Sequence, residues 1–218
     1  MSVYEHIVEV NRLAGQPLAG ADLDARAKRS LDLFIAISLF ILLAPAMLII
    51  AGLIALDSRG PVLFRQTRTG EGGRLFDIYK FRTMDVCENG ERIMQARPND
   101  PRVTRLGRVL RRTSLDELPQ LINVVKGEMS LIGPRPHALA HDRLYGALIE
   151  NYAQRQRVRP GISGWAQVNG HRGETPTIES MRERVEHDLW YARHRSFTLD
   201  LKILFRTAYQ ILGRANAW

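Results

Sequence analysis

The feature that most constrains this chain is an uninterrupted apolar segment near its N-terminus. Leu33 to Leu56 are 24 residues without a single charged side chain. As a helix this segment would be roughly 36 Å long, which exceeds the roughly 30 Å hydrocarbon thickness of a bilayer. It begins too late, is too long and follows too acidic a stretch to be a signal peptide. We therefore expect a membrane-bound protein.

Pro45 lies near the middle of the segment and leaves two membrane topologies open. Proline removes a backbone hydrogen bond and clashes with the carbonyl one turn earlier. Basic residues flank both ends of the segment, so the positive-inside rule selects no orientation. Hydropathy alone favours a kinked helix that crosses the membrane once. A helix that enters, breaks at Pro45 and returns to the same side is the alternative.

The remainder of the 218 residues is basic and rich in arginine. The net charge is +8, and 27 of the 31 basic residues are arginine. Residues 59–115 alone carry a net +7. Guanidinium groups bind phosphates and carboxylates with paired hydrogen bonds. Their place directly after the apolar segment favours membrane phospholipid or a phosphate-rich ligand, and we expect no nucleic-acid partner.

Hydrophobic periodicity predicts short strands and several helices after the apolar segment. Strands are expected at 61–64 and 75–81, on either side of a glycine-rich turn. Helices are expected over the ranges 88–97, 103–111, 115–125, 139–156, 176–194 and about 199–212. The last has an apolar face that suits either core packing or a membrane interface. Domain boundaries are expected at 1–27, 28–57 and 58–218.

Two adjacent carboxylates, Asp116 and Glu117, are the first candidates for chemistry. Their purely structural interpretation is helix capping, because Ser114 and Glu117 match a capping box and Asp116 could itself be the N-cap. Spacing alone favours capping. The functional interpretation is a compact anionic site in which one carboxylate is a nucleophile and the other orients a divalent cation or handles a proton.

Several basic residues are candidates for binding phosphate. Arg135 lies between two prolines that stiffen its loop, so it could hold a phosphate, or equally cap the end of a helix. Lys80, Arg111 and Arg112 form either a solvated basic face or, gathered near the carboxylates, a site for a phosphoanhydride with Mg²⁺. Dinucleotide-binding and P-loop motifs do not occur in the sequence, which excludes those two classes of site.

The order of several longer motifs resembles the bacterial sugar transferases, which are monotopic polyprenyl-phosphate phosphoglycosyl transferases. The resemblance covers residues 28 to 218. Its motifs are, in order, Lys28-Arg29-x-x-Asp32, the apolar stretch with Pro45, Gln66–Gly70, Lys80–Met84, Ser114–Leu121, Met129–Pro136 and Arg159–Gly170. Two positions depart from the usual pattern, with Ala44 in place of serine and Thr69 in place of proline.

This resemblance implies an α+β, predominantly helical fold. A small cytosolic catalytic domain with short strands would be anchored by a Pro-broken re-entrant helix and by interfacial amphipathic helices, which reverses the preference from hydropathy. The N-terminal residues 1–27 would be an extension. The protein would lie on the cytoplasmic face of the bacterial inner membrane, and a homo-oligomer is compatible with the sequence.

The activity implied is the transfer of a hexose-1-phosphate, glucose or galactose, from a UDP-sugar to undecaprenyl phosphate with release of UMP. This would be the first membrane step of exopolysaccharide biosynthesis. An N-acetylhexosamine-1-phosphate is the alternative cargo. From other classes, a membrane-anchored scaffold that binds anionic lipid and a Mg²⁺-dependent membrane phosphohydrolase stay open.

The resemblance also implies residue roles. Asp116 would attack the β-phosphate and form a covalent aspartyl phosphosugar. Glu117 would position Mg²⁺ or handle the acceptor's proton, so both carboxylates are candidate metal ligands. Arg111 and Arg135 match phosphate-binding arginines of the family, and Lys80 is a weaker match.

Overall fold

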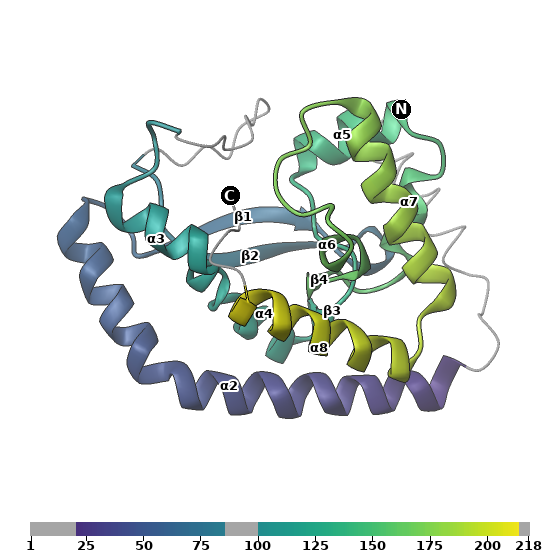
Figure 1. The fold of residues 1–218 in the computed structure, drawn as a ribbon, viewed down its shortest axis with the longest axis horizontal. Coiled ribbons are helices and arrows are strands. Elements are labelled where there is room, and N and C mark those ends of the chain that lie inside the picture. Colours follow the sequence, from purple (N-terminus) through teal and green to yellow (C-terminus); the bar gives the residue numbers. More distant parts are fainter. Residues whose placement is uncertain (1–20, 86–99, 214–218) are drawn as a thin grey trace.

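The structure, a computed structural model, describes residues 21–85 and 100–213 (Figure 1). Its described part is mostly helical with short strands, which confirms the expected fold class. The elements are α2 (Ala21–Asp57), β1 (Leu63–Thr69), η1 (Glu71–Gly73), β2 (Leu75–Phe81), α3 (Arg105–Thr113), η2 (Leu115–Glu117), α4 (Gln120–Lys126), β3 (Ser130–Ile132), α5 (Leu139–Leu148), η3 (Tyr152–Arg157), β4 (Gly161–Ser163), α6 (Trp165–Val168), α7 (Ile178–His194) and α8 (Phe197–Gly213).

The apolar segment lies in α2, which within the described ranges is the one helix long and apolar enough to cross a membrane. Its apolar side chains are largely exposed: Phe34 is 72% exposed, Ile41 69% and Leu48 74%. Such a surface is unfavourable in water and suggests membrane association. The chain stays helical through Pro45, and the helix bends in its second half (Figure 1). The expected break is therefore a bend, caused by the hydrogen bond that proline cannot donate.

Polar residues tie the first half of α2 to the rest of the protein. Arg29 donates to two carbonyls in the last turn of α4, at 2.6 and 3.0 Å. Asp32 accepts a hydrogen bond of 3.1 Å from the backbone N–H of Leu131 in β3. Lys28 forms an ion pair with Asp200 of α8, and α8 runs alongside α2 (Figure 1). The helix itself begins at Ala21, ahead of the domain boundary expected at residue 28.

The second half of α2 is tied down at its C-terminus. Arg82 is buried and donates to the carbonyls of Ile54, Ser58 and Pro61 at 2.5 to 3.2 Å. The last carbonyls of a helix have few helical partners, and a guanidinium there can bond to them and to the carbonyls that follow the helix. The adjacent Phe81 packs in a cluster with Ile54. Both halves of α2 are thus bonded to the same globular body.

The strands form two small sheets. β1 and β2 pair as an antiparallel hairpin in the register Leu63↔Phe81 to Thr69↔Leu75. The predicted strand 75–81 is confirmed, whereas the first strand begins later than expected and is longer. The parallel pair of β3 and β4 was not predicted. Strands of three residues are too short to give a periodic signal.

Two predicted helices are divided in the structure. The expected helix 115–125 becomes η2 followed by α4, because Pro119 precedes α4 and Ser114 has a left-handed backbone with φ of 59°. The expected helix 139–156 becomes α5 and η3, separated at Asn151, whose φ is 60°. α3, α7 and α8 lie close to their expected ranges. The predicted helix 88–97 lies outside the described residues.

Glycines allow β3 and β4 to approach closely. A Cβ on Gly161 would lie 2.1 Å from the backbone nitrogen of Gly133 and 2.4 Å from the carbonyl oxygen of Ser163. Neither contact can be relieved by moving a side chain. This packing fixes the start of the loop at 133–136, which carries Arg135.

We expect Gly161→Ala to destabilise the fold by about 2–3 kcal/mol, because backbone must move to admit the methyl group. Thermal unfolding in detergent should show a melting temperature about 5–10 °C lower. Gly52→Ala is the control, since a Cβ there meets nothing within 4 Å. Equal melting temperatures for Gly161→Ala and the wild type would contradict the close-approach argument.

Candidate active site

Asp116 and Glu117 lie in the short η2 turn and cap no helix. The N-cap position of α4 is Pro119, and neither η2 nor α4 has a side-chain cap. The capping interpretation is therefore wrong. Ser114 ends α3 in its left-handed conformation, and its hydroxyl accepts a hydrogen bond from Arg172 instead. Both carboxylates are left for other contacts.

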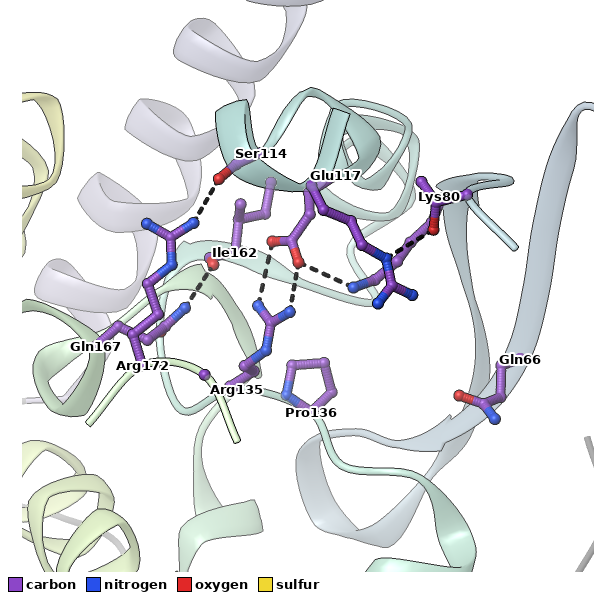
Figure 2. Close-up of polar contacts among 12 residues, drawn as sticks. Gln66, Lys80, Ser114, Glu117, Arg135, Pro136, Ile162, Gln167 and Arg172 are labelled. Carbon is purple, nitrogen blue, oxygen red and sulfur yellow. Dashed lines mark hydrogen bonds and ion pairs between the residues drawn. The ribbon is translucent and has the colours of Figure 1, made fainter. Parts of the chain in front are cut away.

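Glu117 is held by two cations. Lys80 of β2 donates to Glu117 Oε1 at 2.9 Å. The Arg135 guanidinium forms paired hydrogen bonds with both Glu117 oxygens, with a distance of 3.1 Å to Oε2. Figure 2 shows Lys80 and Arg135 reaching Glu117 from two sides. Arg135 therefore caps no helix, and Lys80 does not belong to a solvated basic face.

The two partners set the charge of Glu117. Burial alone would raise the pKa of Glu117, but Arg135 and Lys80 lower it well below its usual range. Burial lowers the pKa of Lys80, and the charge of Glu117 raises that of Arg135. The three groups form one compact ion-paired unit with a net positive charge.

Asp116 is buried, with 8% of its surface exposed, and differs from its neighbour in having no hydrogen bond from any described residue. Burial and the charge of Glu117 raise the pKa of Asp116 to about 6, against the opposing effect of the nearby cations. At pH 7 about 90% of such a carboxylate is ionised. It is thus an anion with an uncommitted lone pair at neutral pH.

Arg111 completes the predicted set. It is the last-turn arginine of α3 and donates from Nε to the Thr83 hydroxyl at 2.8 Å. Burial lowers its pKa, and Arg111 in turn lowers the pKa of Asp116. The structure therefore brings together all five predicted residues, Lys80, Arg111, Asp116, Glu117 and Arg135. The neighbouring Arg112 is exposed.

Three supporting residues were missed by the sequence analysis. Asn123 of α4 accepts from the Tyr79 N–H at 3.1 Å, which fixes the strand position next to Lys80. Arg68 of β1 donates to the Pro136 carbonyl at 3.2 Å, and so holds the loop of Arg135. Arg172 brings a further guanidinium to the edge of the site (Figure 2). Arg68 lies within the Gln66–Gly70 motif, which is the signal that could have revealed it, whereas Asn123 and Arg172 lie outside the motifs named above.

The donor set fits a metal ion that substrate phosphates help to hold. Within residues 21–85 and 100–213, no cluster of three or more His, Cys, Asp or Glu side chains could bind a metal. Mg²⁺ in phosphoryl-transfer sites needs only one or two carboxylates, with phosphate oxygens and water as the other ligands. Asp116 offers such a carboxylate, whereas both Glu117 oxygens already accept hydrogen bonds.

The arrangement combines the elements needed for nucleophilic attack on a phosphate ester. An ionised carboxylate can act as a nucleophile. Cations fixed beside it can bind the phosphate oxygens and stabilise the charge of the transition state.

Comparisons with known proteins agree with this chemistry. The sequence profile of the bacterial sugar transferase family matches residues 23–214. A UDP-glucose:undecaprenyl-phosphate glucose-1-phosphate transferase of Caulobacter vibrioides is 52% identical over 204 residues, which cover 94% of this chain and 76% of the relative.

Two further relatives are longer than the present chain. The Escherichia coli K12 protein with the same name is 51% identical over 203 residues, or 93% of this chain and 43% of the relative. A UDP-N-acetylgalactosamine-undecaprenyl-phosphate N-acetylgalactosaminephosphotransferase of Aeromonas hydrophila is 46% identical over 187 residues, again covering 43% of the relative. The chain thus spans less than half the length of these two proteins.

The raised pKa of Asp116 predicts a stability effect. The pKa of Asp116 is about 6 in the folded protein, against an ordinary value of 3.8 that holds for the unfolded chain. The neutral carboxyl therefore stabilises the fold fully below pH 3.8, and this contribution is lost as the pH rises through 6. Asp116→Asn mimics the neutral form. In metal-free buffer it should be more stable than the wild type at pH 7, by at most about 3 kcal/mol. Urea unfolding should show a smaller gain at pH 4.5, and a variant less stable than the wild type at pH 7 would contradict the assignment.

Proposed function

Since the chain belongs to the bacterial sugar transferase family, we propose that it transfers a hexose-1-phosphate from a UDP-sugar to undecaprenyl phosphate and releases UMP. Glucose is the favoured sugar, because the Caulobacter and Escherichia coli relatives are named for it. The observation that carries the proposal is the unpaired, buried Asp116 carboxylate beside the ion-paired Glu117.

In the first step the Asp116 carboxylate attacks the β-phosphorus of the UDP-sugar. A bond forms between Asp116 Oδ and phosphorus, and the bond from phosphorus to the bridging oxygen breaks. UMP leaves with that electron pair, and the phosphosugar stays on Asp116 as an acyl phosphate. Lys80, Arg111 and Arg135 bind the phosphate oxygens and stabilise their charge during this displacement.

In the second step a phosphate oxygen of undecaprenyl phosphate attacks the same phosphorus. The bond to Asp116 breaks, the free carboxylate is regenerated, and a diphosphate joins the sugar to the lipid. A covalent intermediate divides one difficult transfer into two easier ones. Glu117 acts mainly by holding Lys80 and Arg135 in place, since both of its oxygens accept their hydrogen bonds.

Mg²⁺ would be held by Asp116 and the donor phosphates, and would supply charge neutralisation at the diphosphate. Glu117 as a second ligand stays a prediction, because it would first have to release one of its cationic partners.

The membrane topology that fits this function is a re-entrant helix. Lys28, Arg29 and Asp32 bond one half of α2 to the globular body, and Arg82 bonds its C-terminus to that same body. Attachment of both halves of the helix to one globular body supports a topology in which both ends lie on the same side of the bilayer. The exposed Phe205 and Tyr209 of α8, which contacts α2, suit an interfacial helix on the cytoplasmic face.

An N-acetylhexosamine-1-phosphate is the second candidate cargo. It is favoured by the Aeromonas relative, whose name specifies N-acetylgalactosamine. A donor panel separates the two, because the reaction centre at phosphorus is the same and only the sugar differs.

The decisive assay is nucleotide release from UDP-sugars in the presence of undecaprenyl phosphate and Mg²⁺. Wild-type protein in nanodiscs should release UMP with UDP-glucose and form a lipid-linked product. Asp116→Asn should reduce this rate by at least about 10³-fold, because the nucleophile is lost. Asp77→Asn is the matched control, since Asp77 is exposed on β2 and, among the described residues, its side chain bonds only to Thr67.

Other products would overturn this proposal. Release of UDP would mean that the sugar moves without its phosphate. UMP formed without any lipid acceptor in multiple turnovers would indicate a phosphohydrolase. If no UDP-hexose or UDP-N-acetylhexosamine leads to nucleotide release, the result would favour a membrane-anchored scaffold that binds anionic lipid.

The topology is tested by cysteine labelling in a Cys87→Ser background. Ser30→Cys and Asp57→Cys lie at exposed positions on the two halves of α2. A membrane-impermeant maleimide should label both in inside-out vesicles and neither in intact spheroplasts. Leu42→Cys, in the apolar middle, should resist the reagent from either side. Labelling of residues 30 and 57 from opposite sides would establish a single span.

A further inference from the structure

A buried arginine lies behind the loop that presents Arg135. Arg155 of η3 donates from Nη2 to the main-chain carbonyl of Arg135 at 2.5 Å. The Arg155 side chain is only 3% exposed, so it reaches the loop from the interior of the protein. Arg135 is thus held at two points, by Arg155 at its backbone and by Glu117 at its guanidinium.

Carboxylates from two other helices fix Arg155. Asp188 of α7 accepts from Arg155 Nε at 3.1 Å and from Nη2 at 2.8 Å, and its side chain is 2% exposed. Asp142 of α5 lies 4.0 Å from Arg155 Nη1 and also accepts from the Tyr152 hydroxyl at 2.7 Å. The position of this guanidinium is therefore determined by α5 and α7 together.

Helix packing alone does not explain this ion pair. Desolvation offsets much of the attraction within a buried pair, and apolar residues of similar volume usually hold helices together equally well. What apolar residues cannot supply is a donor at a fixed place for the Arg135 carbonyl. The flanking Pro134 and Pro136 lack N–H groups, so the loop has few hydrogen bonds of its own.

We propose that Arg155, fixed by Asp188, is a positioning residue that sets where the Arg135 guanidinium meets the diphosphate of the donor. The proposal rests on the proposed function, since it assigns Arg135 to donor binding. Arg155 acts through the main chain and does not touch the substrate. Displacement of Arg135 weakens donor binding more than it slows the chemical step, because Asp116 is held by a different element.

Arg155→Lys separates the ion pair from the contact with the loop. The ammonium of lysine lies one bond nearer the backbone than Arg155 Nη2, so it can pair with Asp188, which Nε also reaches, but falls short of the Arg135 carbonyl. We expect the KM for UDP-glucose to rise about tenfold, with a smaller fall in kcat. The affinity for UDP-glucose, measured by calorimetry without added metal in an Asp116→Asn background, should fall by a similar factor.

Val185→Ala is the matched control for a merely structural effect. Val185 is buried on α7 in a cluster with Tyr152, and its truncation loosens the same helix without touching the polar contacts. It should lower the melting temperature with KM unchanged. Asp188→Asn, which keeps the size of the side chain, should raise KM in the same direction as Arg155→Lys and serves if the lysine variant does not fold.

A wild-type KM and affinity in the Arg155 and Asp188 variants would overturn the proposal. So would an equal rise in KM for Val185→Ala at a similar loss of melting temperature. A wild-type protein that binds UDP-glucose without releasing UMP would instead overturn the proposed function, and the calorimetry would still decide the role of Arg155.

Discussion

The site depends on the ion pairs that Glu117 forms with two cations. Its partners come from separate parts of the chain, Lys80 from the β-hairpin and Arg135 from the loop after β3. Two half-buried cations would repel each other without it. Because Glu117 engages both cations, Asp116 stays unpaired in the same cluster. The charge of Glu117 and burial raise the pKa of Asp116 to about 6, while the nearby cations oppose that shift and so favour its ionised form. The Glu117 carboxylate thus holds the site together, and the adjacent Asp116 carboxylate is available for reaction.

Much of the architecture follows from short-range signals. The length of the apolar segment predicted α2, and the alternation of apolar and polar residues predicted β2. The adjacency of Asp116 and Glu117 and the stiff setting of Arg135 pointed to residues that the structure brings together. Predictions failed where local patterns competed with tertiary contacts: the capping box around Ser114 is not formed, and the parallel β3–β4 pair joins strands far apart in sequence. The sequence analysis missed Arg155 because its partners are a distant carbonyl and a distant carboxylate.

The arginine surplus has more than one physical cause. The proposed phosphate ligand would account for Arg135 and Arg111, but several other arginines are buried or half-buried and face the protein's own backbone. Arg68, Arg82 and Arg155 each donate to main-chain carbonyls of loops or helix ends. A guanidinium has five donors in a planar fork and can satisfy several acceptors at once. Loops without regular hydrogen bonding are held in place by this means.

The attachment of α2 has a consequence for which substitutions the protein can tolerate. Arg29 and Arg82 bond to carbonyl groups, which every residue type possesses. Substitution of the side chain at an accepting position therefore does not remove these hydrogen bonds. The donors have no such freedom, because a lysine offers one nitrogen where the arginine fork reaches several oxygens. Genetic variation at this junction should accordingly be one-sided, with fixed arginines facing acceptor positions that vary where they lie outside the core, as Val125 does, and not where they are buried, as Val124 and Ile54 are.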